Sequence, residues 1–166
     1  MDVDPIRCRL ELTSQGKILK DIINELRNMI YNLRPMSFDD IGFNITVERA
    51  LDKLRNSNNI RCNFKTSGDE YMVDSLVSLT LLRVIQEACS NSIKHGHAKE
   101  INVSLKYEPK SLTLTIKDDG DGFDTSAIPE FTRDDNSGFG LSMMKERIYL
   151  LSGKISISSK PGEGCI

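Results

Sequence analysis

Apolar residues recur at helical spacing in four stretches of this 166-residue chain. In residues 12–33, leucine, isoleucine and methionine occupy heptad-like positions, with charged residues and asparagines between them. This pattern predicts an amphipathic helix, which should end at the Arg-Pro pair 34–35 because proline disfavours helical geometry in the residue before it. Further helices are predicted over about 44–56, over 74–95 and around 141–151.

Between these stretches the pattern changes to alternation of apolar and polar residues, which is typical of strands. Residues 101–107 and 112–117 alternate on either side of a turn at 108–111, and they predict an antiparallel hairpin with one solvated face. Residues 60–65 and 155–158 predict two more strands. The chain after residue 35 is therefore expected to be a mixed domain of helices and strands.

The predicted helix at 12–33 spans about three heptads and needs a partner to cover its apolar stripe. It can pack on its own domain, or it can be one helix of an intermolecular bundle. The apolar pattern by itself slightly favours packing on its own domain.

Composition narrows the class of protein. Lys and Arg number 22 and Asp and Glu 24, a net charge of −2, so electrostatics give no reason to expect nucleic acid or a membrane surface as partner. No apolar run approaches the roughly 20 residues of a membrane-spanning helix, and the acidic first residues do not indicate a secretion signal. The four cysteines, which include no C-x-x-C pair, are expected to be reduced residues of a cytoplasmic protein: Cys8, Cys62, Cys89 and Cys165.

A first group of candidate residues lies on the predicted helix 74–95. Glu87 and Asn91 are four residues apart and share a face, and Lys94 follows three residues later. Oxygen ligands suit Mg²⁺, a lysine suits phosphate, and a carboxylate can orient or deprotonate an attacking group. A solvated polar stripe on the helix is the alternative interpretation.

Three glycine-containing segments follow. Asp118-Asp119-Gly120-Asp121-Gly122 comes directly after a strand, where glycines let the backbone approach a ligand, although a plain turn with solvated acids fits as well. Gly138, Gly140 and Leu141 open a helix, where backbone amides can bind an anion. A further glycine pair, Gly162 and Gly164, precedes Cys165. Each segment alone is weak evidence.

The order of these four motifs along the chain is much more specific than any one of them. It resembles the N, G1, G2 and G3 boxes of the GHKL ATPases, over roughly residues 40–166. Residues 30–43, with their Leu-Arg-Pro and Asp-Asp-Ile-Gly motifs, resemble a junction of the NarL/DesK/DegS class of sensor histidine kinases, as do residues 143–147. Within this class, the motifs resemble the DegS type. The resemblance implies an α+β fold, a Bergerat-type two-layer α/β sandwich with a mixed sheet, preceded by one long amphipathic helix.

The resemblance also implies roles for individual residues. Glu87 would be the general base, and Asn91 the Mg²⁺ ligand. Asp118 would accept a hydrogen bond from the adenine amino group. The other implied nucleotide contacts are Lys94 near the phosphates, Gly120 and Gly122 around the adenine, Gly138, Gly140 and Leu141 at the phosphates, and Cys165, which stands where the family usually has threonine. Residues 124–137 would form a lid over ATP.

The implied organisation has two parts. Residues 1–35 would be a leader and the second helix of a dimerisation bundle, which favours intermolecular packing of helix 12–33. Residues 36–166 would be the ATP-binding catalytic domain. Neither His95 nor His97 is in an H-D pair, so we expect the phosphoryl-accepting histidine to lie on a bundle helix outside this chain. The family also continues into a last strand beyond residue 166.

The function implied is transfer of the ATP γ-phosphoryl group to that histidine, with ATP and Mg²⁺ as cofactors. A response regulator and a second copy of the kinase would be partners, in the cytoplasm or on the cytoplasmic side of a membrane anchor. This chain alone should bind ATP without autophosphorylating. Two alternatives remain: an anti-sigma-factor-like serine kinase and binding switch, against which the 30–43 junction argues, and a degenerate dimerisation module, against which the intact motifs argue.

Overall fold

The structure, a computed structural model, describes residues 42–125 and 139–166. The predicted helix 12–33, the domain boundary near residue 35, Gly138 and most of the predicted lid lie outside these residues. The elements in chain order are α3 (Phe43–Asn58), β1 (Arg61–Ser67), α4 (Ser75–Lys94), β2 (Glu100–Glu108), β3 (Ser111–Asp118) and α5 (Phe139–Leu150). Each of them corresponds to a predicted helix or strand, with bounds that differ by a few residues.

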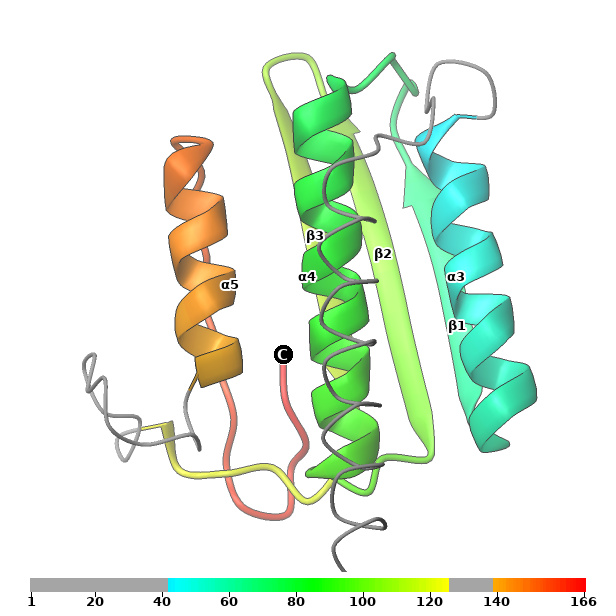
Figure 1. The fold of residues 1–166 in the computed structure, drawn as a ribbon, viewed down its shortest axis with the longest axis vertical. Coiled ribbons are helices and arrows are strands. Elements are labelled where there is room, and N and C mark those ends of the chain that lie inside the picture. Colours follow the sequence, from blue (N-terminus) through cyan, green and yellow to red (C-terminus); the bar gives the residue numbers. More distant parts are fainter. Residues whose placement is uncertain (1–41, 126–138) are drawn as a thin grey trace, which may run out of the picture. The chain divides into compact units, whose positions relative to one another are not determined.

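The described strands form one mixed sheet in the order β1-β2-β3. β1 pairs with β2 in parallel, and β2 pairs with β3 antiparallel, with Glu108 opposite Ser111 at the hairpin turn. The helices α3 and α4 stand in front of the sheet, and α5 stands beside α4 on the side away from α3 (Figure 1). The α+β fold with a mixed sheet, expected from the sequence, is confirmed.

The hairpin has one buried and one solvated face. Along β2, Ile101, Val103 and Leu105 are buried against the helices, and the residues between them are exposed. On the outer face, Asn63 of β1 donates a hydrogen bond to Asn102 of β2 at 3.0 Å. The alternation read from the sequence therefore reports the two faces of the sheet correctly.

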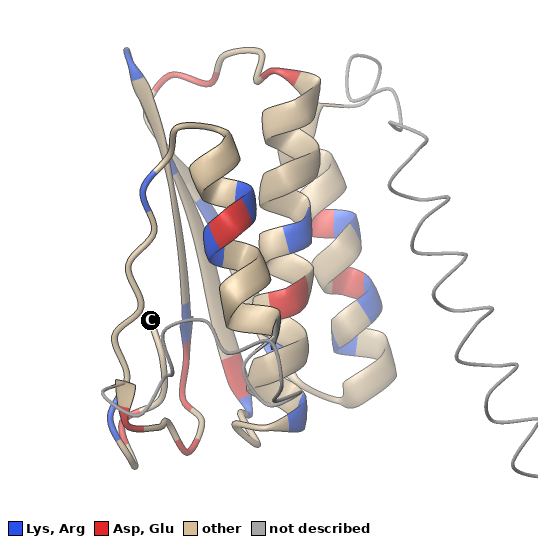
Figure 2. Cartoon of the chain, turned by 60° about the vertical axis from the view of Figure 1, so that its left-hand side comes forward, with Lys and Arg blue, Asp and Glu red and all other residues tan. Residues whose placement is uncertain are grey.

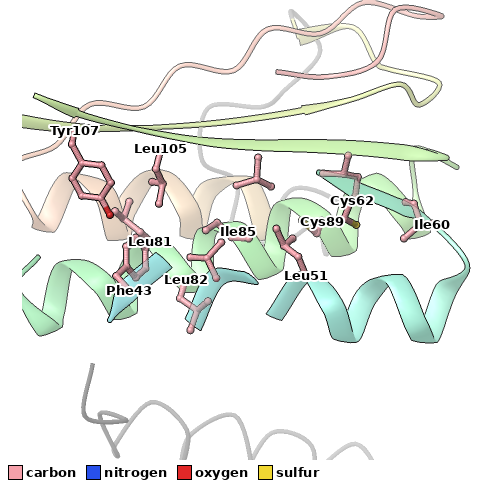
Figure 3. Close-up of a cluster of buried hydrophobic side chains, with 13 residues drawn as sticks. Phe43, Leu51, Ile60, Cys62, Leu81, Leu82, Ile85, Cys89, Leu105 and Tyr107 are labelled. Atoms are coloured by element: carbon pink, nitrogen blue, oxygen red, sulfur yellow. The ribbon is translucent and has the colours of Figure 1, made fainter. Parts of the chain in front are cut away.

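The apolar core lies between α3, α4 and the sheet (Figure 3). Burial of apolar area stabilises the fold by roughly 25 cal/mol per Å². The core side chains include residues with no measurable exposure from both helices and from the sheet: Val47, Leu51, Ile85, Cys89, Ile101 and Leu105.

Local hydrogen bonds and backbone conformations mark the start of α4 and the end of α5. The Asp74 carboxylate accepts hydrogen bonds from the backbone amides of Leu76 at 2.8 Å and Val77 at 3.3 Å, which caps the start of α4. After α5, Ser152 has a φ of 56° and the Gly153 amide donates to the Ile148 carbonyl at 3.0 Å. The predicted end of this helix near residue 151 is confirmed, since α5 ends at Leu150.

The predicted strand at 155–158 is wrong for the described structure. These residues keep the alternating burial, but they form no ladder with another described segment. Ser158 and Ile166 exchange two backbone hydrogen bonds of 2.8 Å, and Ser159 and Cys165 form one isolated bridge. Alternation in a sequence reports which side chains are buried, whereas a strand also needs a neighbouring backbone, and the pattern of 155–158 does not supply one.

Candidate functional site

A cavity of about 1570 Å³ lies between α4, α5, β3 and the segment that follows α5. Residues of four separate motifs line it: Glu87, Asn91, Asp118, Gly122, Gly140, Leu141 and Cys165. They come from α4, from the loop after β3, from the start of α5 and from the C-terminal residues. The fold therefore brings most of the predicted site residues to one cavity.

The remaining predicted residues lie elsewhere. Lys94 is exposed in the last turn of α4 and is not among the described residues that line the cavity. Gly120 is buried, and a Cβ there would overlap with the Gly96 carbonyl oxygen. Gly138 lies outside the described residues, as does the predicted lid after residue 125. The roles of these residues stay predictions.

Glu87 and Asn91 meet on the cavity side of α4, as their four-residue spacing predicts. The Asn91 amide nitrogen donates to Glu87 Oε1 at 3.3 Å. The first turn of α5 lies against this pair, because a Cβ added at Gly140 would overlap with Glu87 Oε1. A larger residue at 140 would displace the carboxylate, so glycine allows the helix start and the carboxylate to approach each other.

Asp118 ends β3 as a buried carboxylate, 8% exposed, and its oxygens accept three hydrogen bonds from the protein. Oδ1 accepts from the backbone amides of Gly120 at 2.9 Å and Cys165 at 3.2 Å. Oδ2 accepts from the Ser92 hydroxyl at 2.6 Å. A buried carboxylate is stable when donors surround it in this way, and its orientation is then fixed.

Two loops pack backbone to backbone beside Asp118. Gly122 has a φ of 62° and Gly164 a φ of 73°, and a Cβ on either one would overlap with a carbonyl oxygen of the facing loop. Ser159, which is buried, joins the same loops: its hydroxyl donates to the Gly164 carbonyl at 2.6 Å and accepts from the Phe123 amide at 2.9 Å. The loop after β3 is therefore held in place by the residues before the C-terminus.

The described cysteines are free thiols in two environments. Burial raises the pKa of Cys89 to about 12. Burial also raises the pKa of Cys62, which is buried beside α3. Cys165 lines the cavity, and burial, together with the nearby Asp118 carboxylate, raises the pKa of its thiol. All three thiols therefore stay protonated at neutral pH.

Sequence reasoning missed two residues of this site, Ser92 and Ser159. Each is 7% exposed, and each bonds to a partner distant in the chain. A signal for Ser92 was present: it is a polar residue on a largely apolar helix, directly after the candidate Asn91. Its partner Asp118 is 26 residues away, and only the packing of α4 on β3 brings the two together.

The arrangement offers two kinds of chemistry. The buried Asp118 can accept a hydrogen bond from a ligand group in the cavity. Glu87 and Asn91 present a carboxylate and, because the Asn91 nitrogen bonds to Glu87, an amide oxygen that remains available. Among the described residues no three histidine, cysteine, aspartate or glutamate side chains gather into a metal cluster.

Neither the distribution of charge on the described helices nor their hydrophobicity indicates a further kind of site. Basic and acidic residues are interspersed along the described helices (Figure 2). None of the helices in the described part of the chain is both long enough and apolar enough to cross a membrane.

Comparison with protein families gives one match. The family described as "Histidine kinase-, DNA gyrase B-, and HSP90-like ATPase" matches residues 77–166. The matched range begins in α4, before Glu87, and includes every described residue of the cavity motifs.

Two curated proteins are similar to the chain over nearly all of its length. The signal transduction histidine-protein kinase/phosphatase DegS of Brevibacillus brevis is 33% identical over 154 residues, which are 93% of this chain and 38% of that protein. An uncharacterized sensor-like histidine kinase of Chloroflexus aurantiacus is 34% identical over 167 residues, 99% of this chain and 28% of that protein. The chain thus spans well under half of the length of either relative.

Among solved structures, the histidine kinase AdeS of Acinetobacter baumannii has a similar fold. The two superpose with a TM-score of 0.60 at 18% sequence identity, over 99% of this chain and 83% of that chain. At this identity the likeness concerns the fold alone.

Proposed function

Because this chain belongs to the histidine kinase-, DNA gyrase B- and HSP90-like ATPase family and contains the ATP-binding catalytic domain of a histidine kinase, we propose how its cavity binds ATP and what the intact protein does with it. The observation that carries the proposal is the meeting of Glu87, Asn91, Asp118 and Gly140 in one cavity. A cavity of this size is more than sufficient for a nucleotide, since ligand pockets are typically about 300–1000 Å³.

The adenine lies at Asp118. Its exocyclic amino group donates to the Asp118 carboxylate, and Gly122 and Cys165, which also line the cavity, border the base. Support comes from the three protein donors that hold the carboxylate in one orientation. A preorganised acceptor binds a donor without the cost of ordering it.

The phosphates lie at Glu87, Asn91 and the start of α5. Backbone amides of the first turn around Gly140 and Leu141 bind the phosphate oxygens, with Gly138 and Lys94 as further contacts. The available oxygen of Asn91 suits Mg²⁺, which usually takes one or two protein ligands and completes its shell with water and phosphate. The bound ion would neutralise charge on the phosphates during transfer.

In the intact protein this domain presents the γ-phosphoryl group to a histidine on a bundle helix, and Glu87 acts as the general base for the attacking imidazole. The apolar stripe of residues 12–33 forms part of the bundle through which two copies dimerise. The phosphoryl group then passes to a response regulator. The domain works in the cytoplasm, free or as the cytoplasmic portion of an anchored kinase.

Titration calorimetry of the 166-residue chain with a non-hydrolysable ATP analogue and Mg²⁺ tests the nucleotide site. We expect binding by the unaltered chain and none by Asp118→Ala, which removes the acceptor and leaves the Gly120 and Cys165 amides without it. No binding by the unaltered chain at millimolar ligand would refute the proposal.

The transfer chemistry needs a second experiment, in the intact kinase. We expect Glu87→Ala to bind ATP with similar affinity and to lose phosphorylation of the histidine. If Glu87→Ala lost only binding, the base role would be wrong. Supplying a histidine-bearing bundle helix and, separately, a serine-bearing antagonist protein distinguishes a histidine kinase from a serine kinase.

A further inference from the structure

Ser92 places a hydroxyl at the inner wall of the cavity, in the last turns of α4. Its Oγ lies 2.6 Å from Asp118 Oδ2 and 3.0 Å from the Ala88 carbonyl oxygen. Both neighbours are acceptors, and a serine hydroxyl has one proton to donate. The direction of that proton therefore decides how the serine interacts with the carboxylate.

The proton points to Asp118. If it pointed to Ala88, a lone pair of the hydroxyl would face a carboxylate oxygen at 2.6 Å, and two acceptors would repel each other in a buried setting. A hydrogen bond of this length to an ionised acceptor is in the range of the stronger, charge-assisted bonds. Ser92 is thus a fixed donor to Oδ2.

The remaining capacity of Asp118 can then be counted. A carboxylate offers about four lone-pair positions. The Gly120 and Cys165 amides use both positions of Oδ1, and Ser92 uses one of Oδ2. One acceptor position remains, on the oxygen that Ser92 orients.

We infer that Ser92 is a positioning and specificity-determining residue, which holds Asp118 Oδ2 as an acceptor so that the cavity selects a purine with an amino group over one with a carbonyl group. The inference rests on the proposed ATP site. A carbonyl oxygen at the same position would face Oδ2 acceptor to acceptor. Without the Ser92 hydroxyl, a water molecule can enter beside Oδ2, and water can bridge either an amino or a carbonyl group.

The test compares ATP with inosine triphosphate, which has a carbonyl in place of the adenine amino group. The dissociation constants of both nucleotides are measured with Mg²⁺ for the 166-residue chain, for Ser92→Ala and for Ser90→Ala. Ser90 is the matched control: it lies on the same helix, and its side chain forms no hydrogen bond within the described residues. Thermal unfolding confirms that each variant is folded.

For Ser92→Ala we expect ATP binding to weaken about tenfold, the size typical of a lost hydrogen bond to a charged group. Binding of inosine triphosphate should weaken much less. The preference of the protein for ATP over inosine triphosphate, given by the ratio of the two dissociation constants, should therefore fall by a similar factor. Ser90→Ala should keep the ratio of the unaltered chain. If Ser92→Ala left this ratio unchanged, for example by weakening the binding of both nucleotides equally, the proposed role of Ser92 would be wrong and the proposed ATP site would still stand. If the unaltered chain bound neither nucleotide, the proposed ATP site itself would be wrong.

Discussion

The two sides of helix α4 are built differently. On one side lies α3, whose Phe43, Val47 and Leu51 are buried in the apolar core together with residues of α4 and the sheet. On the other side stands α5, where Met144 is buried while Tyr149 is 81% and Leu150 76% exposed. Between α5 and α4 lies the cavity, lined by the carboxylate, amide and glycines of the proposed ATP site.

The difference shows how one helix serves both stability and function. The α3 side of α4 supplies apolar burial, which holds the domain together. The α5 side contains a cavity and polar side chains, and it therefore lacks the apolar packing that would otherwise occupy that space. The sheet and the α3 side therefore have to supply the stability that the cavity side does not.

The largest expected effect breaks the packed side. Leu51→Ala should lower the free energy of unfolding by about 3 kcal/mol, since it removes a side chain with no exposure from a dry core. Met144→Ala, on the cavity side, should cost about half as much, because its side chain lines existing space. Urea unfolding followed by circular dichroism measures both. Equal losses would contradict the contrast between the two sides.

A second change tests the loops that close the cavity side. Gly164→Ala should lower the free energy of unfolding by about 2 kcal/mol or more, because φ is 73° and the new Cβ would overlap with the Asp118 carbonyl oxygen. Gly162→Ala is the control: its φ is 82°, yet nothing lies within 4 Å of its Cβ position. It should show the cost of the backbone conformation alone, about 1 kcal/mol. A loss for Gly162→Ala as large as that for Gly164→Ala would refute the close packing.

A third change separates function from stability at the start of α5. Gly140→Ala should alter the free energy of unfolding by less than about 1 kcal/mol, since alanine favours the helix and the group that must move is the end of the Glu87 side chain. It should nevertheless slow phosphotransfer in the intact kinase, because Glu87 leaves its position. A phosphorylation assay of the intact kinase and thermal unfolding of the same variant compare the two effects. A variant with unchanged transfer would show that the placement of Glu87 is not critical.

The smallest expected effect concerns charge between α4 and α5. Burial and the nearby Arg147 lower the pKa of Arg83, and Arg83 Nε is buried without a hydrogen-bond partner among the described residues. Arg147→Met should raise the free energy of unfolding by about 0.5 kcal/mol, the size of a surface charge interaction, with helix propensity almost unchanged. The gain should shrink in high salt. Lys145→Met, at an exposed position on the same helix, should show no such gain. An equal gain there would point to a general effect of methionine in place of a basic residue on this helix.

Much of the site could be predicted from the sequence because its motifs are local. The four-residue spacing of Glu87 and Asn91 fixes their common face in any helix, and a strand that runs into Asp118 and two glycines fixes a carboxylate at a turn. The spacing of Lys94 from Asn91 suggested a shared site, yet Lys94 is exposed outside the lining of the cavity. Spacing along a helix places two residues on one face, but it does not determine how far along that face the cavity extends.

The sequence by itself determined the periodicities of α3, α4, α5 and the β2–β3 hairpin, and the order of the motifs, since these depend on residues a few positions apart. The tertiary structure decided which motifs meet. It joined Ser92 to Asp118, used Ser159 to tie the loops together, and left 155–158 without a ladder. Contacts between distant segments depend on how helices pack and which backbones lie side by side, and local pattern contains no record of either.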